Sequence, residues 1–362
     1  MNTEKIPAVK FRQYQGNIET KAGADSGKAH DALKKVKRDK ALLADAKTRI
    51  IKKAEEHYNA GLELKKEKKF QEALDELSKA VKIDPDYIPA YTEAARILAF
   101  CGRPDMALHI IQKEVLIRDT NNISGRDLLG YIYLQRGMAE EALAQYNKII
   151  EIDPDDARGH MGKGNVYFLT GRTDEALAVF KELIKTGSKN NDPEVTAEIY
   201  KGIGCIYAFE KMFEEAVLNL NKSIEINSKD IAVHISLASC YLAQGKLEKA
   251  REVLEKALKL FPDSDKICTT IGITYYLEKD YDKAFEYFMQ SLKINQNNGE
   301  THYGLSKVYY ERQEYSNAIK HCKEALRLKY EVPEEFIENL ENIENEKLEE
   351  AMAGKLTSRD AR

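Results

Sequence analysis

The sequence has no tryptophan and only eight prolines among its 362 residues, whereas 43% of the residues are hydrophobic and 32% are charged. This composition suits amphipathic helices better than a compact β fold. The sequence also lacks an apolar run of about 18 residues that would span a membrane, and its first residues show no apolar stretch of the secretory kind. These absences predict a cytoplasmic chain without a membrane span.

Cysteine is scarce as well, with five residues and no CxxC spacing. An odd number of scattered cysteines indicates reduced thiols packed as small apolar groups, and argues against a disulfide framework or a metal site. No GxxxxGK[ST] phosphate loop occurs, and no nucleophile and base can be picked out among the Ser, His and Cys residues. The sequence therefore predicts no enzyme and no cofactor.

Alanine recurs at a nearly fixed spacing of 34, 35, 34, 40, 34, 34 and 34 residues. The alanines are Ala73, Ala107, Ala142, Ala176, Ala216, Ala250, Ala284 and Ala318. Such a period is the mark of a solenoid, in which each unit buries its apolar face against its neighbours. If this alanine is residue 20 of each unit, the units begin at Ala54, Ile88, Ile123, Ala157, Ala197, Ile231, Asp265 and Gly299.

Each unit has the pattern of a helical hairpin. Position 8 holds a small residue in every copy, position 11 is Leu or Tyr, and position 24 is bulky in most copies. Because two helices approach closely only where side chains are small, positions 8 and 20 mark the helix crossing. Glycine at position 15 (Gly102, Gly137, Gly171 and Gly245) predicts a left-handed residue that ends the first helix. Proline at position 32 (Pro85, Pro154 and Pro262) ends the second helix.

These residues resemble the pattern of the tetratricopeptide repeat family over residues 54–330. The resemblance implies an all-α fold, a right-handed superhelical solenoid of about eight helix-turn-helix repeats with helical extensions at both ends. Some copies lack the family's proline, which leaves the ends of their second helices open. Six extra residues between copies four and five, including 187–191, should lengthen a helix or a loop.

The expected organisation has five parts. Residues 1–27 form a disordered tail, 28–53 a basic amphipathic helix, 54–330 the eight repeats, 331–355 an acidic capping helix and 356–362 a second tail. Residues 1–53 carry 14 Lys or Arg and 6 Asp or Glu, whereas residues 331–362 carry 4 and 10. Both terminal helices are expected to cap the array. The alternative is that the oppositely charged ends attract each other between molecules, giving head-to-tail self-association.

In arrays of this family, positions 2, 5, 9 and 12 of the first helices line a concave groove, so the resemblance implies a groove for a protein or peptide partner. The predicted groove residues are Tyr131, Met161, Asn165, Phe168, Lys201, Ile235, Ser239, Ile273, Tyr276, Tyr303, Lys307 and Tyr310. The alternative for each of them is simple packing between neighbouring helices. The family's clamp for chaperone C-termini is not expected, because Asn165 follows Met161 instead of Lys and Lys201 precedes Cys205 instead of Asn.

Position 4 holds histidine in four copies, at His57, His160, His234 and His302. Equivalent positions of a solenoid lie about 10 Å apart or more, whereas metal ligands lie about 2 Å from one ion. These histidines are therefore expected to pack between helices and not to form a metal ladder.

The most direct interpretation is a non-catalytic scaffold or adaptor that binds a partner polypeptide in its groove. Two alternatives remain, an accessory or targeting subunit of a transferase, pilus or secretion machine, and a regulatory nucleic-acid binder that uses the basic N-terminal arm. The net charge of −4 and the lack of an aromatic platform among the basic residues argue against nucleic acid.

Overall fold

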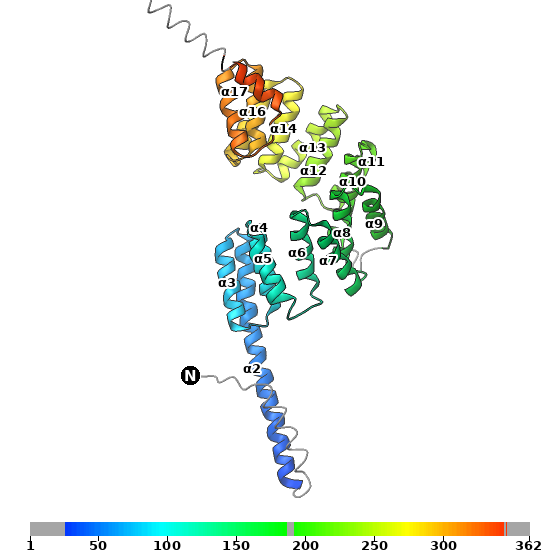
Figure 1. Cartoon of the computed structure of the whole chain (residues 1–362), viewed down its shortest axis with the longest axis vertical. Helices are drawn as coiled ribbons and strands as arrows, with labels where there is room; N and C mark the ends of the chain where they lie inside the picture. Colours follow the sequence, from blue (N-terminus) through cyan, green and yellow to red (C-terminus); the bar gives the residue numbers. More distant parts are fainter. Residues whose placement is uncertain (1–25, 187–191, 344, 346–362) are drawn as a thin grey trace, which may run out of the picture. The chain divides into compact units, whose positions relative to one another are not determined.

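The computed structural model describes residues 26–186, 192–343 and 345. Within these ranges every regular element is a helix, and consecutive helices pair as hairpins along the chain (Figure 1). This confirms the all-α repeat fold. The two predicted tails, apart from residues 26 and 27, and the segment 187–191 lie outside the described residues.

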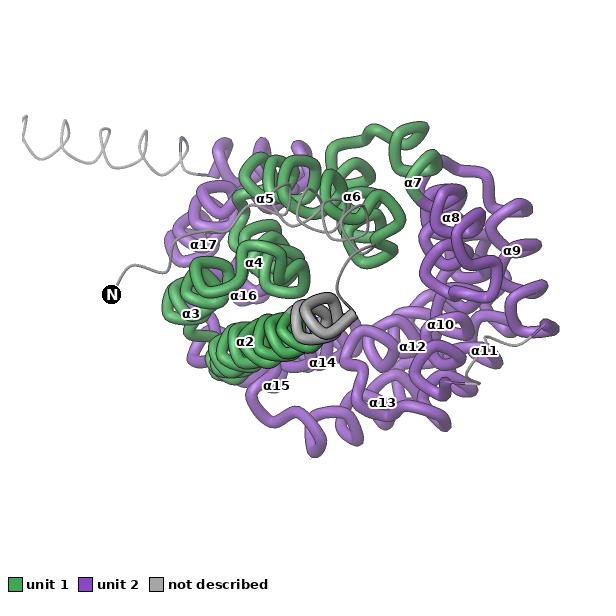
Figure 2. Tube along the Cα trace, turned by 90° about the horizontal axis from the view of Figure 1, so that it is seen from below, with its two compact units in different colours: residues 1–145 green, residues 146–362 purple. Residues whose placement is uncertain are grey.

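Two compact units divide the chain, residues 1–145 and 146–362 (Figure 2). The first unit contains α2 (Ser26–Lys66), α3 (Phe70–Ile83), α4 (Ile88–Phe100), α5 (Pro104–Ile110), the π-helical turn η1 (Ile111–Val115) and α6 (Ile123–Gln135). The unit boundary falls within α7 (Ala139–Ile152).

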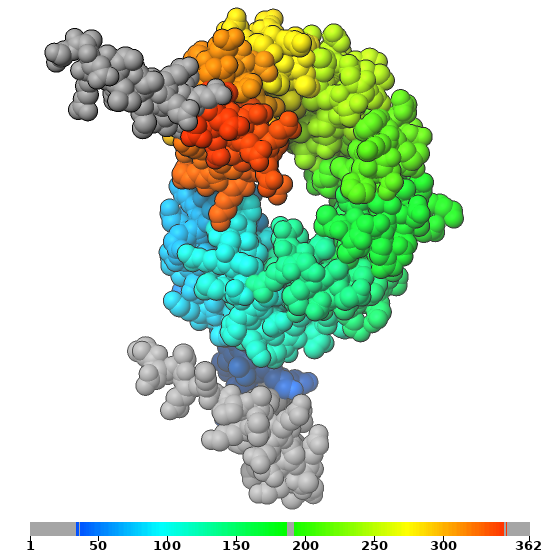
Figure 3. Space-filling view, turned by 45° about the horizontal axis from the view of Figure 1, so that its top comes forward, coloured from blue at the N-terminus to red at the C-terminus, as the bar shows by residue number. Residues whose placement is uncertain are grey.

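The second unit continues with α8 (Ala157–Leu169), α9 (Thr173–Thr186), α10 (Pro193–Phe209), α11 (Phe213–Ile226), α12 (Ile231–Ala243), α13 (Leu247–Leu260), α14 (Asp265–Leu277), α15 (Tyr281–Ile294), α16 (Gly299–Glu311) and α17 (Tyr315–Arg327). Residues 334–343 are helical as well. Within each unit, each repeat contacts its sequence neighbours. The atoms of successive segments accordingly follow one another in chain order in the space-filling view (Figure 3).

The helix crossing inside each repeat is built as the small residues predict. All eight position 20 alanines have 0% exposure. At position 8, a Cβ added to Gly164 would lie 2.7 Å from Cζ of Phe180, the bulky residue at position 24 of the same repeat. Gly272 meets Phe288 in the same way, also at 2.7 Å. The small residues thus let the second helix lie close to the first.

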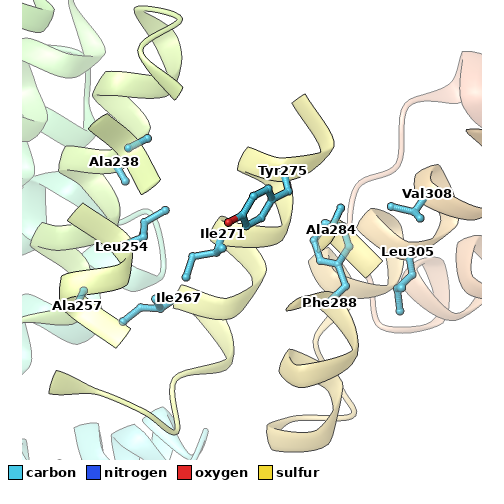
Figure 4. Close-up of a cluster of buried hydrophobic side chains, with 11 residues drawn as sticks. Ala238, Leu254, Ala257, Ile267, Ile271, Tyr275, Ala284, Phe288, Leu305 and Val308 are labelled. Atoms are coloured by element: carbon cyan, nitrogen blue, oxygen red, sulfur yellow. The ribbon is translucent and has the colours of Figure 1, made fainter. Parts of the chain in front are cut away.

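A continuous core runs from repeat to repeat. In the second unit, one buried cluster draws residues from α12 through α16, and Figure 4 shows their side chains meeting between the helices. Phe288 of α15 has 0% exposure and contacts both Gly272 of α14 and Gly304 of α16. One ring therefore packs against its own repeat and the next one, which is how a solenoid shares its core.

The turn between the two helices of a repeat has a left-handed residue at position 15 in every copy. The four glycines predicted there have φ between 70° and 77°. The other four copies place Lys68, Lys211, Lys279 and Gln313 in the same region, with φ between 59° and 63°. In each copy the position 16 N–H donates to the position 11 carbonyl, for example Arg172 to Tyr167 at 2.8 Å. The backbone therefore requires this conformation even where the residue is not glycine.

Several second helices end at position 30 whether or not proline follows. Helix α3 ends before Pro85, whereas α11 and α15 end at Ile226 and Ile294, which are also position 30, without a proline. In those copies Asn227 and Asn295 accept a hydrogen bond from the N–H two residues later. Asp84 and Asp153 accept the same bond in copies that have proline, so this turn follows the second helix with or without a proline.

Two irregular spacings have local explanations. The 35-residue step matches the π turn of η1, where the N–H of Leu116 donates to the carbonyl of Ile111, five residues back, at 2.9 Å. One extra residue is thus absorbed inside a helix. The extra length of the 40-residue step is partly accounted for by α10, which has 17 residues where most first helices have 13. The expected lengthening of a helix is found at its N-terminal end.

The two terminal helices differ in how they pack. Residues 28–53 belong to the continuous helix α2, and every described side chain from residue 34 to 53 is exposed, whereas Ala54 is the first buried one. The expectation that this segment caps the first repeat is therefore not met. At the other end, Leu340 of the helix at 334–343 is buried with Ala318, Cys322 and Ala325 of α17. This helix covers the last repeat, as a cap would.

The left-handed backbone conformation is less favourable for lysine than for glycine, which has no Cβ. We therefore predict that Lys211→Gly stabilises the protein by about 0.5–1 kcal/mol. The measurement is the urea midpoint of the far-ultraviolet circular dichroism signal. Lys256 is exposed within helix α13, so Lys256→Gly is the matched control and should lower stability by about 1 kcal/mol. A lower midpoint for Lys211→Gly would contradict the argument.

Candidate functional site

The inner-face positions are defined as positions 2, 5, 9 and 12 of each repeat. Some of their side chains are exposed, and others pack between helices. In the first unit, Tyr131 of α6 is 50% exposed. In the second unit, Asn165 of α8 and Ser239 of α12 are exposed as well. These three side chains are accessible to a partner, while the other predicted residues are partly buried.

Several predicted groove residues pack between helices of the second unit. Met161 and Phe168 lie against the buried cluster of α8 to α10, and the ring of Phe168 meets that of Phe209 edge to face at 5.7 Å. Ile235 and Ile273 lie against the cluster of α12 to α16. Packing between neighbouring helices is thus part of what these four residues do.

Lys201 of α10 is held by two carboxylates. Its Nζ lies 2.6 Å from Glu198 and 2.9 Å from Asp230, the residue that caps α12. Burial opposes the charge of this lysine, but the hydrogen bonds to both carboxylates raise its pKa above the ordinary value. The lysine therefore stays charged and ties one repeat to the next.

The last two repeats bring Tyr276, Tyr303, Lys307 and Tyr310 together. The Nζ of Lys307 lies 4.5 Å from the ring centre of Tyr276 and 4.8 Å from that of Tyr303. Burial lowers the pKa of Lys307 and raises that of Tyr276, whose hydroxyl donates to Glu311 at 3.3 Å. These contacts join α14 and α16 through a lysine between two aromatic faces.

The helix at 334–343 adds Phe336 to this aromatic group. Its ring lies 5.6 Å from the rings of both Tyr303 and Tyr310. The inner-face positions of the last repeat are thus partly covered by the chain's own C-terminal helix.

A cavity of about 390 Å³ opens on the inner-face positions of the first unit. Its lining includes Tyr58 of α2, Thr92 and Arg96 of α4, and Ser124 of α6, which are positions 5, 5, 9 and 2 of three successive repeats. These residues were not predicted, because the predicted groove residues all belong to the third and later copies. The same positional rule, applied to the first three copies, would have found them.

Charge is concentrated on one side of this cavity. The carboxylate of Glu93 forms ion pairs with Lys65 and with Nε of Arg96, the latter at 3.5 Å. Burial raises the pKa of Tyr58, and the nearby Glu93 raises it further. The side chain of Arg96 is 40% exposed, so its guanidinium is accessible to a carboxylate or a main-chain carbonyl.

A larger cavity of about 480 Å³ lies elsewhere in the second unit, among α7, α8 and α9. Its lining includes Ile150, His160 and Glu182, and none of the predicted groove residues. Size alone therefore does not mark the inner face, and we give more weight to the smaller cavity because three successive first helices build it.

The position 4 histidines are structural. His160, His234 and His302 each place Nε2 at 2.9 to 3.1 Å from the carbonyl oxygen six residues earlier, at position 32 of the preceding repeat. His57 pairs with Glu76 at 2.7 Å. This agrees with the expected packing role. In the described ranges, no group of three His, Cys, Asp or Glu residues is arranged to hold a metal ion.

The cysteines are all free thiols. Cys240, Cys268 and Cys322 are at most 4% exposed, and burial raises the pKa of Cys240 and of Cys268 to about 11. A thiol with so high a pKa is protonated and a poor nucleophile at neutral pH. These three cysteines pack as small apolar groups, as predicted.

The helical hairpins, their shared core and their lined inner face define a repeat solenoid of the protein-binding type. Family models described as TPR repeat or tetratricopeptide repeat match residues 54–87, 130–171, 155–229 and 230–297, more than half of the chain. The chain belongs to the tetratricopeptide repeat family. The resemblance seen in the sequence is confirmed.

Curated relatives match only in part. BBSome complex member BBS4 of Mus musculus is 33% identical over 76 residues, 21% of this chain and 14% of the relative. Protein O-mannosyl-transferase TMTC3 of Homo sapiens is 24% identical over 201 residues, 55% of this chain and 22% of the relative. The chain thus spans less than a quarter of the length of either relative.

Solved structures show the same fold. The APC/C hetero-tetramer Cut9-Hcn1 aligns with a TM-score of 0.55 and 20% identity, covering 75% of this chain and 52% of the other. A tetratricopeptide repeat protein from Parabacteroides merdae aligns with a TM-score of 0.52 and 18% identity, covering 71% and 99%. Among the described helices, none is both long and apolar enough to cross a membrane.

His302 of α16 and His321 of α17 form a pair whose protonation should make the stability of the protein depend on pH. Their Nδ1 atoms lie 2.9 Å apart, and Nε2 of His302 contacts the carbonyl of Gln296. If Nε2 of His302 donates to that carbonyl, its Nδ1 accepts from Nδ1–H of His321 when both rings are neutral. Burial, with help from His302 and Lys320, lowers the pKa of His321 to about 4.

We predict that the free energy of unfolding falls as pH decreases from about 6.5 to about 4. In this interval His321 is protonated in the unfolded chain but remains neutral in the folded protein. A shift of this size corresponds to roughly 3 kcal/mol, fully present above the unfolded pKa. The thermal midpoint as a function of pH measures it. His321→Gln should flatten the curve across this interval, and an unchanged curve would contradict the assignment to His321.

Proposed function

We propose that the chain is a non-catalytic scaffold that holds a segment of another polypeptide along its inner-face positions. The observation that carries this proposal is the cavity of about 390 Å³ lined by α2, α4 and α6. Three successive repeats contribute to it through the positions that face inward in this family. A surface assembled from several repeats suits an extended ligand better than a small molecule.

The lining of the cavity suggests how a peptide would be held. The ring of Tyr58 offers apolar area, and the exposed part of Arg96 offers hydrogen-bond donors for a carboxylate or a main-chain carbonyl. Rigid rings contribute area at low entropic cost, while polar groups fix register. We therefore propose an extended segment with an acidic side chain near Arg96.

The second unit contributes inner-face positions of its own to the proposal. The exposed Asn165 and Ser239 would contact the partner directly. Phe168, Tyr276 and Lys307 also pack between helices, and they would contact the partner through the exposed parts of their side chains. Lys201, Ile235 and Ile273 are proposed mainly to support this face. Each contact is modest, so several repeats would act together.

Two further observations support a place within a larger protein assembly. One relative is a member of the BBSome complex, and one structural neighbour belongs to an APC/C hetero-tetramer. We propose that this chain also serves in a multiprotein complex, in the cytoplasm, where free thiols such as its five cysteines are the rule.

A peptide-display library tests the proposal with the intact chain as bait. Peptides selected for binding should lose at least about tenfold in affinity, or about 1.4 kcal/mol, when Arg96→Ala and Ser124→Trp remove the donor and fill the cavity. Fluorescence polarisation of a labelled selected peptide measures this loss, and circular dichroism checks that helix content is retained.

The matched control is Lys79→Ala, which changes an exposed cation on the second helix of the first repeat. It should bind the same peptides with wild-type affinity. Equal binding by the cavity variant and the control would refute the groove, and selected peptides that lose affinity only in Asn165→Ala and Ser239→Ala would move the site to the second unit.

A further inference from the structure

Helix α2 carries an apolar stripe on which none of the residues that the structure describes is packed. Leu43 is 56% exposed and Ile50 is 46% exposed, and both lie on the helical face that continues to the buried Ala54. Inside the first repeat this face packs against α3. The exposed apolar stripe of α2 is thus a continuation of the helix face that packs against α3 in the first repeat.

The charge of this segment restricts what can cover it. Residues 34–53 contain nine Lys or Arg and two Asp. Two copies of the segment would repel each other if they paired side by side, so the fitting occupant is an acidic surface with an apolar centre.

Such a surface exists at the C-terminal end of the second unit. Ile319, Cys322 and Leu326 of α17 line an apolar groove of about 140 Å³ with Ile337 and Leu340 of the helix at 334–343. Leu326 is 40% exposed there. The helix at 334–343 begins one repeat period after α16, in the place of a first helix. Among the described residues, no second helix packs beside it.

The rim of this groove is acidic on one side. Residues 331–343 contain five Glu and no Lys or Arg. The other wall, α17, carries Lys323 on the groove and Arg327 beyond it, but Arg327 is paired with Glu324 at 2.6 Å. A basic helix would therefore lie with its lysines toward the helix at 334–343.

We propose that the basic segment 34–53 of one copy docks in the groove between α17 and the helix at 334–343 of a second copy. Leu43 and Ile50 enter the apolar centre, and the Lys and Arg residues beside them face the glutamates. The contact is heterologous, because it joins different surfaces of the two copies, so it builds head-to-tail chains or closed rings. This inference does not depend on the peptide groove.

Sedimentation velocity of the full chain over a range of concentrations tests it. The mean mass should rise with concentration at about 50 mM salt and fall toward that of the monomer at about 500 mM salt. The helix variant Leu43→Glu/Ile50→Glu and the groove variant Leu326→Glu/Glu341→Lys should each stay monomeric. Leu218→Glu, which changes a leucine that is 56% exposed on α11, is the control and should associate as the wild type does.

An equal mixture of the helix variant and the groove variant gives the sharpest outcome. Each retains one intact surface, so the mixture should form a dimer and nothing larger. A wild-type chain that is monomeric at both salt concentrations overturns the proposal, as does an associating wild type whose two variants do not complement each other. Wild-type binding to vesicles of anionic lipid without self-association would instead assign the segment to membranes.

Discussion

Close approach of two helices at one crossing point is the constraint on which the whole array depends. The position 20 alanines are completely buried, and a Cβ added to the glycines at position 8 would lie 2.7 to 3.0 Å from Leu77, Phe180, Leu220 or Phe288. Because the crossing is so tight, the bulky residue at position 24 can reach the following repeat as well. The core is therefore continuous within a unit although each repeat is only two helices.

The packing of the helices determines which faces remain available for binding. The faces of the first and second helices that meet in the crossing are used for stability, whereas the inner-face positions are shared between contact with the next repeat and exposure. Lys201 shows the first use, through Glu198 and Asp230, and Asn165 and Tyr131 show the second. The cavity at Arg96 is lined by three successive repeats, so the recognition that we propose is spread over repeats.

The sequence predicted the features that depend on side-chain volume, namely the hairpins, the crossing and the structural histidines, because size and period are visible in the residues themselves. Lys68, Lys211, Lys279 and Gln313 escaped prediction as left-handed residues, since nothing in a lysine signals a positive φ. The exposure of Leu43 and Ile50 also could not be foreseen: an amphipathic pattern identifies a face but not what covers it. The cavity at Arg96 lies at inner-face positions of the first three copies, and these positions follow the same pattern as the predicted groove residues of the later copies.

The π turn at 111–115 has a consequence for how such an array can change over time. An added residue in a helix normally rotates everything after it by about 100°, which would turn the next apolar face away from its neighbour. Here the widened turn takes up the addition within five residues, and Ile123 begins its helix in correct phase with the units that follow. Second helices of this kind can therefore accept single-codon insertions without loss of the downstream architecture, so length variation need not be confined to the loops.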